Sequence, residues 1–147
     1  MALKESTGFR NSILVTGSTR AALNLGFIDI YSGTVPATAD SAIGAAVKLC
    51  RVSNASTATG LTFEATATGG VLLKASGEVW SGVNIATGVA SFYRYVAAGD
   101  TGAESTSEVR LQGLVAVAGA DMNMSDTTLI SAATHTVDYF AIAAPTN

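Results

Sequence analysis

The side chains best suited to nucleophilic or metal chemistry are scarce in this sequence, which holds one histidine, His135, and one cysteine, Cys50. A structural zinc site needs four ligands, drawn mostly from Cys and His, and these two residues lie far apart in the chain. No Gly-x-Ser-x-Gly nucleophile elbow accompanies them. A single cysteine also excludes an intrachain disulfide. We therefore expect Cys50 to be a small core residue, and His135 to lie in a solvated loop or at the edge of the core.

Acidic side chains offer a second kind of chemistry, and their clearest grouping is Asp121, Asn123 and Asp126. This spacing resembles the start of an EF-hand calcium loop, which requires glycine at its sixth place and glutamate at its twelfth. Those places hold Asp126 and Ala132, so an ordinary turn rich in Asx residues fits better. The sequence therefore predicts no metal site, no cofactor and no enzyme activity.

Aromatic side chains provide the remaining candidate site. In residues 89–96, alternation puts Tyr93 and Tyr95 on one face of a strand and Phe92 on the other. Exposed aromatic residues of this kind, together with Trp80, could stack on a sugar ring. The same residues could equally be core, or anchors of a protein interface. We favour core or interface over a sugar platform.

Composition narrows the class of protein further. Charged residues make up 13% of the chain and the net charge is −3, with the lysines and arginines scattered rather than clustered. This distribution argues against a nucleic-acid partner. No apolar run approaches the roughly 20 residues that span a bilayer, so we expect no membrane partner. The N-terminal residues lack the apolar stretch of a signal peptide, and we expect synthesis in the cytoplasm.

Residues 1–25 differ from the rest of the chain and are expected to form an N-terminal arm. Their apolar side chains are spaced irregularly, and Gly17 weakens any continuous helix. Ser18 is a good N-cap for one short helical turn that ends before Gly26. The sequence therefore predicts an extended arm containing a short helix, followed by a second unit over residues 26–147.

From Gly26 onward, short runs of alternating apolar and polar residues predict β-strands. The expected strands cover residues 27–31, 47–52, 61–64, 71–74, 78–81, 89–96, 108–117, 127–130 and 136–142. Pro36 makes residues 34–40 a connector, because proline cannot donate to the middle of a sheet. Short strands separated by turns indicate an all-β, antiparallel sandwich or barrel, which we assign to residues 26–147.

Four segments resemble a family of small structural proteins encoded by tailed phages and prophages. They are residues 3–11 (LKESTGFRN), 27–40 (FIDIYSGTVPATAD), 77–82 (GEVWSG) and 92–94 (FYR). This family is similar to the jelly-roll decoration, or cementing, proteins on the outside of icosahedral phage heads. The resemblance implies a jelly-roll-like β-sandwich that associates with itself as a dimer or trimer. It also implies binding to the major capsid protein at the virion surface, after synthesis in the host cytoplasm.

The resemblance makes protein contact the expected role, and we expect residues 1–25 and 33–44 to touch the shell or a neighbouring subunit. The candidate contact residues are Leu3, Phe9, Arg10, Ile13, Arg20, Val35, Pro36, Trp80, Tyr93 and Tyr95. A phage tail or baseplate component, such as a receptor-binding tip, would share these features. A carbohydrate-binding module using Trp80 or Tyr93 is a further alternative, and a hydrolase is the least favoured.

Overall fold

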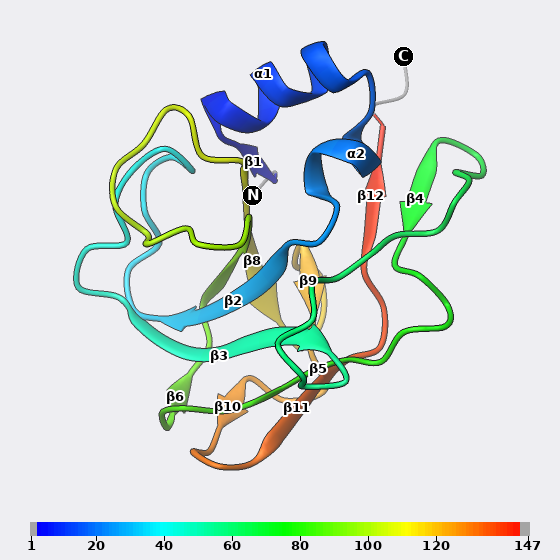
Figure 1. Cartoon of the computed structure of the whole chain (residues 1–147). Helices are drawn as coiled ribbons and strands as arrows, with labels where there is room; N and C mark the ends of the chain where they lie inside the picture. Colours follow the sequence, from blue (N-terminus) through cyan, green and yellow to red (C-terminus); the bar gives the residue numbers. More distant parts are fainter. Residues whose placement is uncertain (1–2, 145–147) are drawn as a thin grey trace.

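The computed structural model describes residues 3–144, and strands dominate it, with 39% strand against 11% helix. The prediction of an all-β protein is therefore confirmed. Within these residues the main sheet has eight strands (Figure 1). Its order is β1 (Lys4–Glu5), β8 (Arg110–Ala116), β7 (Phe92–Val96), β2 (Phe27–Ser32), β3 (Val47–Asn54), β5 (Trp80–Val83) and β11 (Thr134–Val137), with β9 (Met122–Asn123) paired to β8. Two small ribbons pair β10 (Thr128–Leu129) with β6 (Gly88–Val89), and β12 (Ala141–Ala143) with β4 (Val71–Leu73).

Strand β2 lies between β7 and β3, and its two faces meet different surroundings. Ile28 and Ile30 point to one face and are fully buried in the hydrophobic core. Asp29 points to the other face, directly opposite Arg94 of β7, and both of these residues are buried as well. The alternation read from the sequence therefore separates an apolar layer from a buried polar layer.

Aromatic rings fill the apolar layer. Trp80, Tyr93 and Tyr95 pack in the core together with Phe63 and Phe140. The rings of Phe63 and Trp80 meet edge-on with centroids 5.4 Å apart, and those of Tyr93 and Phe140 do so at 5.7 Å. Such pairs contribute about 0.5–1.5 kcal/mol each beyond their burial. The aromatic residues that the sequence left between core and interface are therefore core.

Helix α1 (Thr7–Thr16) replaces most of the extended arm that the sequence predicted. The Ser6 hydroxyl caps it by accepting a hydrogen bond from Phe9 N at 3.0 Å. Gly17 closes it in the left-handed conformation, with φ 80° and its N–H bonded to Ile13 O. Phe9 and Ile13 are four residues apart and share the face that packs on the core. The predicted extended conformation was wrong because these caps and contacts outweigh the weak helix propensity of this segment.

Close backbone packing fixes α1 against the chain that leads into β8. A Cβ added at Gly8 would come within 2.4 Å of the carbonyl oxygens of Ser107 and Glu108. The Ser6 hydroxyl donates to Glu108 O at 2.7 Å and accepts a hydrogen bond from Arg110 N at 2.9 Å. The first helix is therefore packed against the strands and is not free to lie across a neighbour.

The second helix follows the prediction. α2 (Thr19–Leu23) begins at Ser18, whose hydroxyl accepts a hydrogen bond from Ala21 N at 3.0 Å. Leu23 and Phe9 are buried in the same core as the strands. One hydrophobic core therefore includes residues on both sides of position 25.

Several predicted strands differ in detail, and the strand predicted over residues 89–96 is divided into β6, which ends at Val89, and β7, which begins at Phe92. Residues 61–64 make isolated bridges rather than a strand, although Leu61 and Phe63 are buried as predicted. The strand predicted over residues 136–142 is divided, because β11 ends at Val137 and β12 begins at Ala141. Phe140 lies in the break and is 3% exposed. Its ring packs in the core although it lies between the two strands.

Candidate contact surfaces

Four of the predicted contact residues are buried within the chain, which corrects their assignment to an interface. Phe9, Trp80, Tyr93 and Tyr95 are each no more than 1% exposed. Tyr95 Oη donates to Leu23 O at 2.8 Å, so even its polar group is satisfied inside the core. These side chains offer no surface to a protein partner or to a sugar ring.

The other N-terminal candidates divide into two pairs. Leu3 and Ile13 are partly buried and pack against the core. Arg10 and Arg20 are exposed, and Arg20 Nε lies 3.4 Å from the backbone oxygen of Phe63. Contact with a neighbouring subunit stays a prediction for the two arginines.

Val35 and Pro36 are half-buried in residues 33–46, the connector between β2 and β3. The connector lies beside the loop before β8 (Figure 1), and Ile43 N donates to Gly102 O of that loop at 2.9 Å. It curls around a hollow of about 390 Å³ lined by its own residues. Contact between the connector and a partner subunit stays a prediction. The position of the connector is set by the sheet beneath it.

A row of polar side chains on the sheet holds this connector. Arg51, Asp29, Arg94 and Gln112 lie directly opposite one another on β3, β2, β7 and β8. Asp29 accepts hydrogen bonds from Nε and Nη2 of Arg51, both at 2.7 Å. Gln112 Nε2 reaches the connector and donates to Pro36 O at 2.8 Å.

Arg110 and Asp100 form a second buried pair beside this row. Arg110 donates through Nε and Nη2 to the Asp100 carboxylate at 2.6 and 2.7 Å. Burial alone would raise the pKa of Asp100, but the hydrogen bonds from Arg110 and Gly102 outweigh it and hold the pKa below its usual value. The Arg110 guanidinium also donates to Ala39 O of the connector at 3.3 Å.

Arg94 is fully buried and forms no ion pair with any described carboxylate. Its Nε donates to Gln112 Oε1 at 2.8 Å, and its Nη2 donates to Thr38 O and Ser41 O at 3.2 and 2.8 Å. Burial, and then the charge of Arg110, lowers the pKa of Arg94 to about 10. The side chain is therefore still charged at neutral pH and binds the connector through backbone carbonyls.

The histidine and the cysteine are both buried. Cys50 is fully buried, as predicted, and burial raises the pKa of its thiol to about 11, with a further contribution from Asp29. His135 lies on the outermost strand of the sheet and is 8% exposed, which is the core-edge setting predicted for it. Burial lowers the pKa of His135. Residues 3–144 contain no group of three or more His, Cys, Asp or Glu side chains able to hold a metal ion.

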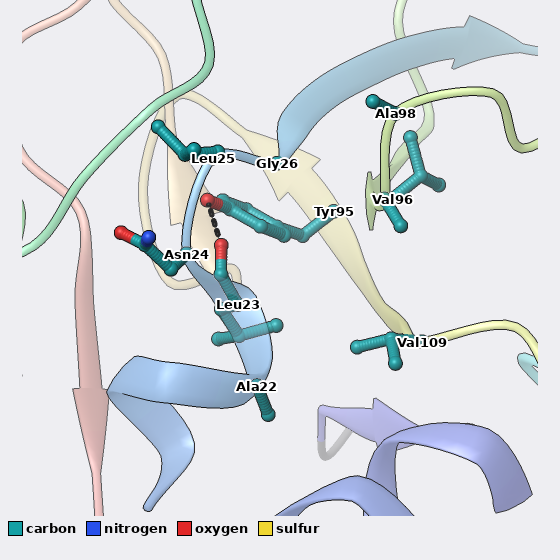
Figure 2. A pocket seen from close by; sticks show the side chains of 10 residues that line it. Ala22, Leu23, Asn24, Leu25, Gly26, Tyr95, Val96, Ala98 and Val109 are labelled. Atoms are coloured by element: carbon teal, nitrogen blue, oxygen red, sulfur yellow. Dashed lines mark hydrogen bonds between the residues drawn. The ribbon is translucent and has the colours of Figure 1, made fainter.

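A small apolar pocket lies where α2 joins β2. Its volume is about 170 Å³, and residues 22–26, residues 95–98 and Val109 line it without any charged side chain. Figure 2 shows Tyr95 bonded to Leu23 within this lining. Pockets for small molecules usually measure about 300–1,000 Å³, so the volume does not indicate a site for a small-molecule ligand.

A group of exposed aliphatic side chains surrounds β6 and β10, and is referred to below as the aliphatic end. Its members are Val47, Val83, Ile85, Val89 and Ile130, which are 49–65% exposed. Asn84 Nδ2 donates to Ile130 O at 3.0 Å and so joins the segment before β6 to the segment after β10. Exposed aliphatic side chains gathered at one end of a protein make that end a candidate contact surface.

The aliphatic end has a signal in the sequence that alternation alone did not reveal. Residues 79–93 and 127–137 contain no charged side chain. Two long charge-free runs from distant parts of the chain meet at this surface through the pairing of β6 with β10.

Comparison of the chain with protein-family models, curated protein sequences and solved structures found no match. Within residues 3–144, no helix is both long and apolar enough to cross a membrane.

Proposed function

We propose that this chain is a phage capsid decoration protein that binds the outer surface of the head and stabilises contacts between major capsid protein subunits. The proposal includes a jelly-roll-like arrangement of its strands and association of the chain with itself. The aliphatic end is the observation that supports it most, because it gathers exposed aliphatic side chains at one end of a β-sheet scaffold.

The backbone that carries this surface is held by hydrogen bonds. Ile85 N donates to Leu49 O at 2.8 Å, and Ala90 N donates to Thr127 O at 2.8 Å. Binding would therefore order little additional backbone. Ordering costs reduce affinity in proportion to the groups that become fixed, so a pre-ordered surface favours contact.

The energy available from one copy is modest. Burial of apolar surface contributes about 25 cal/mol per Å², whereas association costs about 4–15 kcal/mol in lost translational and rotational freedom. Five aliphatic side chains give weak binding by this comparison. Copies that associate with one another on a symmetric shell gain avidity, which suits a protein present in many copies per particle.

Binding of the purified chain to heads that lack it tests the proposal. We expect the wild-type chain to saturate such heads, as measured by co-sedimentation and by added density on the outer surface in electron microscopy. The variant Ile85→Lys/Val89→Lys should lose binding, because it places two charges in the apolar contact. Both side chains are at least 60% exposed, so the fold should tolerate the change.

A matched control makes the same change at the opposite end of the molecule. Leu14 and Val15 on α1 are 83% and 87% exposed, and α1 lies far from β6 and β10 in Figure 1. Leu14→Lys/Val15→Lys should bind heads as the wild type does. Loss of binding in this variant alone would return the contact to residues 1–25, as the sequence first predicted. Failure of the wild-type chain to bind would overturn the decoration proposal.

The alternatives retain different support. The carbohydrate-binding alternative has lost its platform, because Trp80 and Tyr93 are in the core. A tail or baseplate component could use the same aliphatic end, so this surface does not distinguish it from a head protein. The number of copies per particle does distinguish them.

A further inference from the structure

Strand β11 forms one edge of the main sheet, and one side of it is unpaired. It pairs with β5 and stands last in the sheet order. Among the described residues, no backbone hydrogen bond outside the β5 pairing involves Thr134–Val137. In Figure 1, β11 lies along the lower margin of the molecule with nothing drawn beyond it.

The backbone groups on the open side belong to Thr134 and Thr136. Asn84 N donates to Ala133 O at 2.8 Å. The two chain segments are therefore hydrogen-bonded at Ala133, the residue before Thr134. Bonded and non-bonded positions alternate along an antiparallel ladder. The N–H and C=O groups of Thr134 and Thr136 therefore point away from β5, and both residues are exposed.

This edge lacks the features that usually prevent strands from pairing between molecules. The opposite edge, β1, has two residues, Lys4 and Glu5, and both are charged. β11 has four residues and a regular register from Thr134 to Val137, with no proline, bulge or charge. Natural proteins commonly protect an exposed edge with one of these features, and an edge without them is a template for another strand.

We propose that β11 pairs with β11 of a second copy of this chain, antiparallel and about a two-fold axis. Thr134 of each copy lies opposite Thr136 of the other, so the two bonded positions together form four N–H···O hydrogen bonds. The inference rests on the proposed function in one respect, the association of the chain with itself. It identifies the open edge of β11 as the surface through which two copies associate.

A second copy is the occupant that this edge fits best. An antiparallel strand is self-complementary about a two-fold axis, as an isologous interface requires. Residues 127–137 carry no charge, so the axis brings no like charges together. Val83 lies directly opposite Thr134 in the ladder, so the pairing places the aliphatic ends of the two copies beside the same axis.

Sedimentation equilibrium of the full chain, from micromolar to millimolar concentration, tests the inference. We expect the wild type to dimerise. Thr136→Lys and Thr136→Pro should remain monomeric. The first brings a positive charge from each copy to the shared edge, and the second removes an N–H donor that points toward the partner. Thr101→Lys, at an exposed threonine in the loop before β8, should dimerise as the wild type does. Circular dichroism and thermal melting establish that each variant is folded.

Disulfide trapping tests the register. Hydrogen-bonded residues on antiparallel strands have Cα atoms about 5.5 Å apart, within the range that a disulfide spans. Mixing Thr134→Cys with Thr136→Cys under mild oxidation should give a cross-linked dimer in higher yield than either variant alone. Cys50 is fully buried and should not compete.

A monomeric wild type, or folded Thr136 variants that dimerise as the wild type does, would overturn the inference. Equal cross-linking in the mixed and unmixed samples would overturn the register. Head binding by a monomeric Thr136 variant leaves the decoration proposal standing, so failure of the edge pairing and failure of the function are separate results.

Discussion

Arg110 holds Asp100 through two parallel hydrogen bonds of 2.6 and 2.7 Å, and both side chains are 1% exposed. The pair joins β8 to the loop that precedes it. Because the same guanidinium donates to Ala39 O and Asp40 O, it also fixes the connector between β2 and β3. One side chain thus holds β8, the loop before it and a connector some 70 residues earlier in the chain.

Asp100→Asn should destabilise the protein by about 3–5 kcal/mol, because it leaves the Arg110 charge buried without a counter-charge. Urea denaturation followed by circular dichroism measures the free energy of unfolding. Lys48→Met is the control. Lys48 lies 2.8 Å from Asp29 but is 33% exposed, so its loss should cost about 1 kcal/mol or less. A loss below 1 kcal/mol for Asp100→Asn would contradict the structural role of the pair.

Trp80 is the only tryptophan in the chain and is fully buried, so its fluorescence reports on the core. We expect a blue-shifted emission in the native protein that acrylamide quenches poorly. Trp80→Ala should cost about 3–5 kcal/mol. Emission like that of free tryptophan, or shielding of Trp80 only when a saccharide is added, would show instead that the side chain is on the surface.

Gly8→Ala should lower the free energy of unfolding by about 1–3 kcal/mol, because the added methyl group would clash with backbone atoms, which cannot rotate away as a side chain could. The nearest are the carbonyl oxygens of Ser107 and Glu108, 2.4 Å from the ideal Cβ position. Gly77→Ala is the matched control, since nothing lies within 4 Å of its Cβ position. Thermal melting compares the two variants. Equal melting temperatures would mean that α1 is not packed against the chain before β8.

His135 should make the protein less stable as the pH falls through about 6.5. Burial lowers its pKa from the usual 6.5, outweighing an opposing effect of Asp138. As the pH falls through 6.5, the unfolded chain takes up a proton that the folded chain does not, so the free energy of unfolding decreases. This loss ends once the pH is below the folded-state pKa.

Denaturation in urea at pH 8, 6.5 and 5 measures this dependence. His135→Gln should give a flatter profile, because His135 is the only histidine. The contribution of Asp100, whose pKa is lowered in the folded state, is lost only in more acidic solution, as the pH falls below the usual value of 3.8. An unchanged slope in His135→Gln would show that His135 is not responsible.

The strand pattern was largely predictable because alternation persists along the chain. β2, β3, β7 and β8 appear where apolar and polar residues alternate, and Pro36 marked the connector correctly. Alternation could not say which face of β2 or β7 meets solvent, because neither face of these two strands does. Asp29 and Arg94 are as buried as Ile28, so the polar residues of the pattern marked a buried hydrogen-bonded layer rather than a solvent-facing one.

The errors in the N-terminal region have a local cause. Ser6, the spacing of Phe9 and Ile13, and Gly17 together indicate a capped helix, but each signal is weak by itself. The aromatic residues were ambiguous for a different reason. A strand with aromatic side chains on one face suits a core, an interface or a sugar platform equally well, and only the position of distant residues such as Phe140 decides among them.

The number of copies of this chain in purified phage particles tests the central claim most directly. Quantitative mass spectrometry against the major capsid protein gives this number. A decoration protein should be present at a ratio near one, or at a simple fraction such as about one half or one third, because it repeats with the symmetry of the shell. A ratio far below this would place the chain in the tail or baseplate, and its absence from particles would contradict a structural role in the virion.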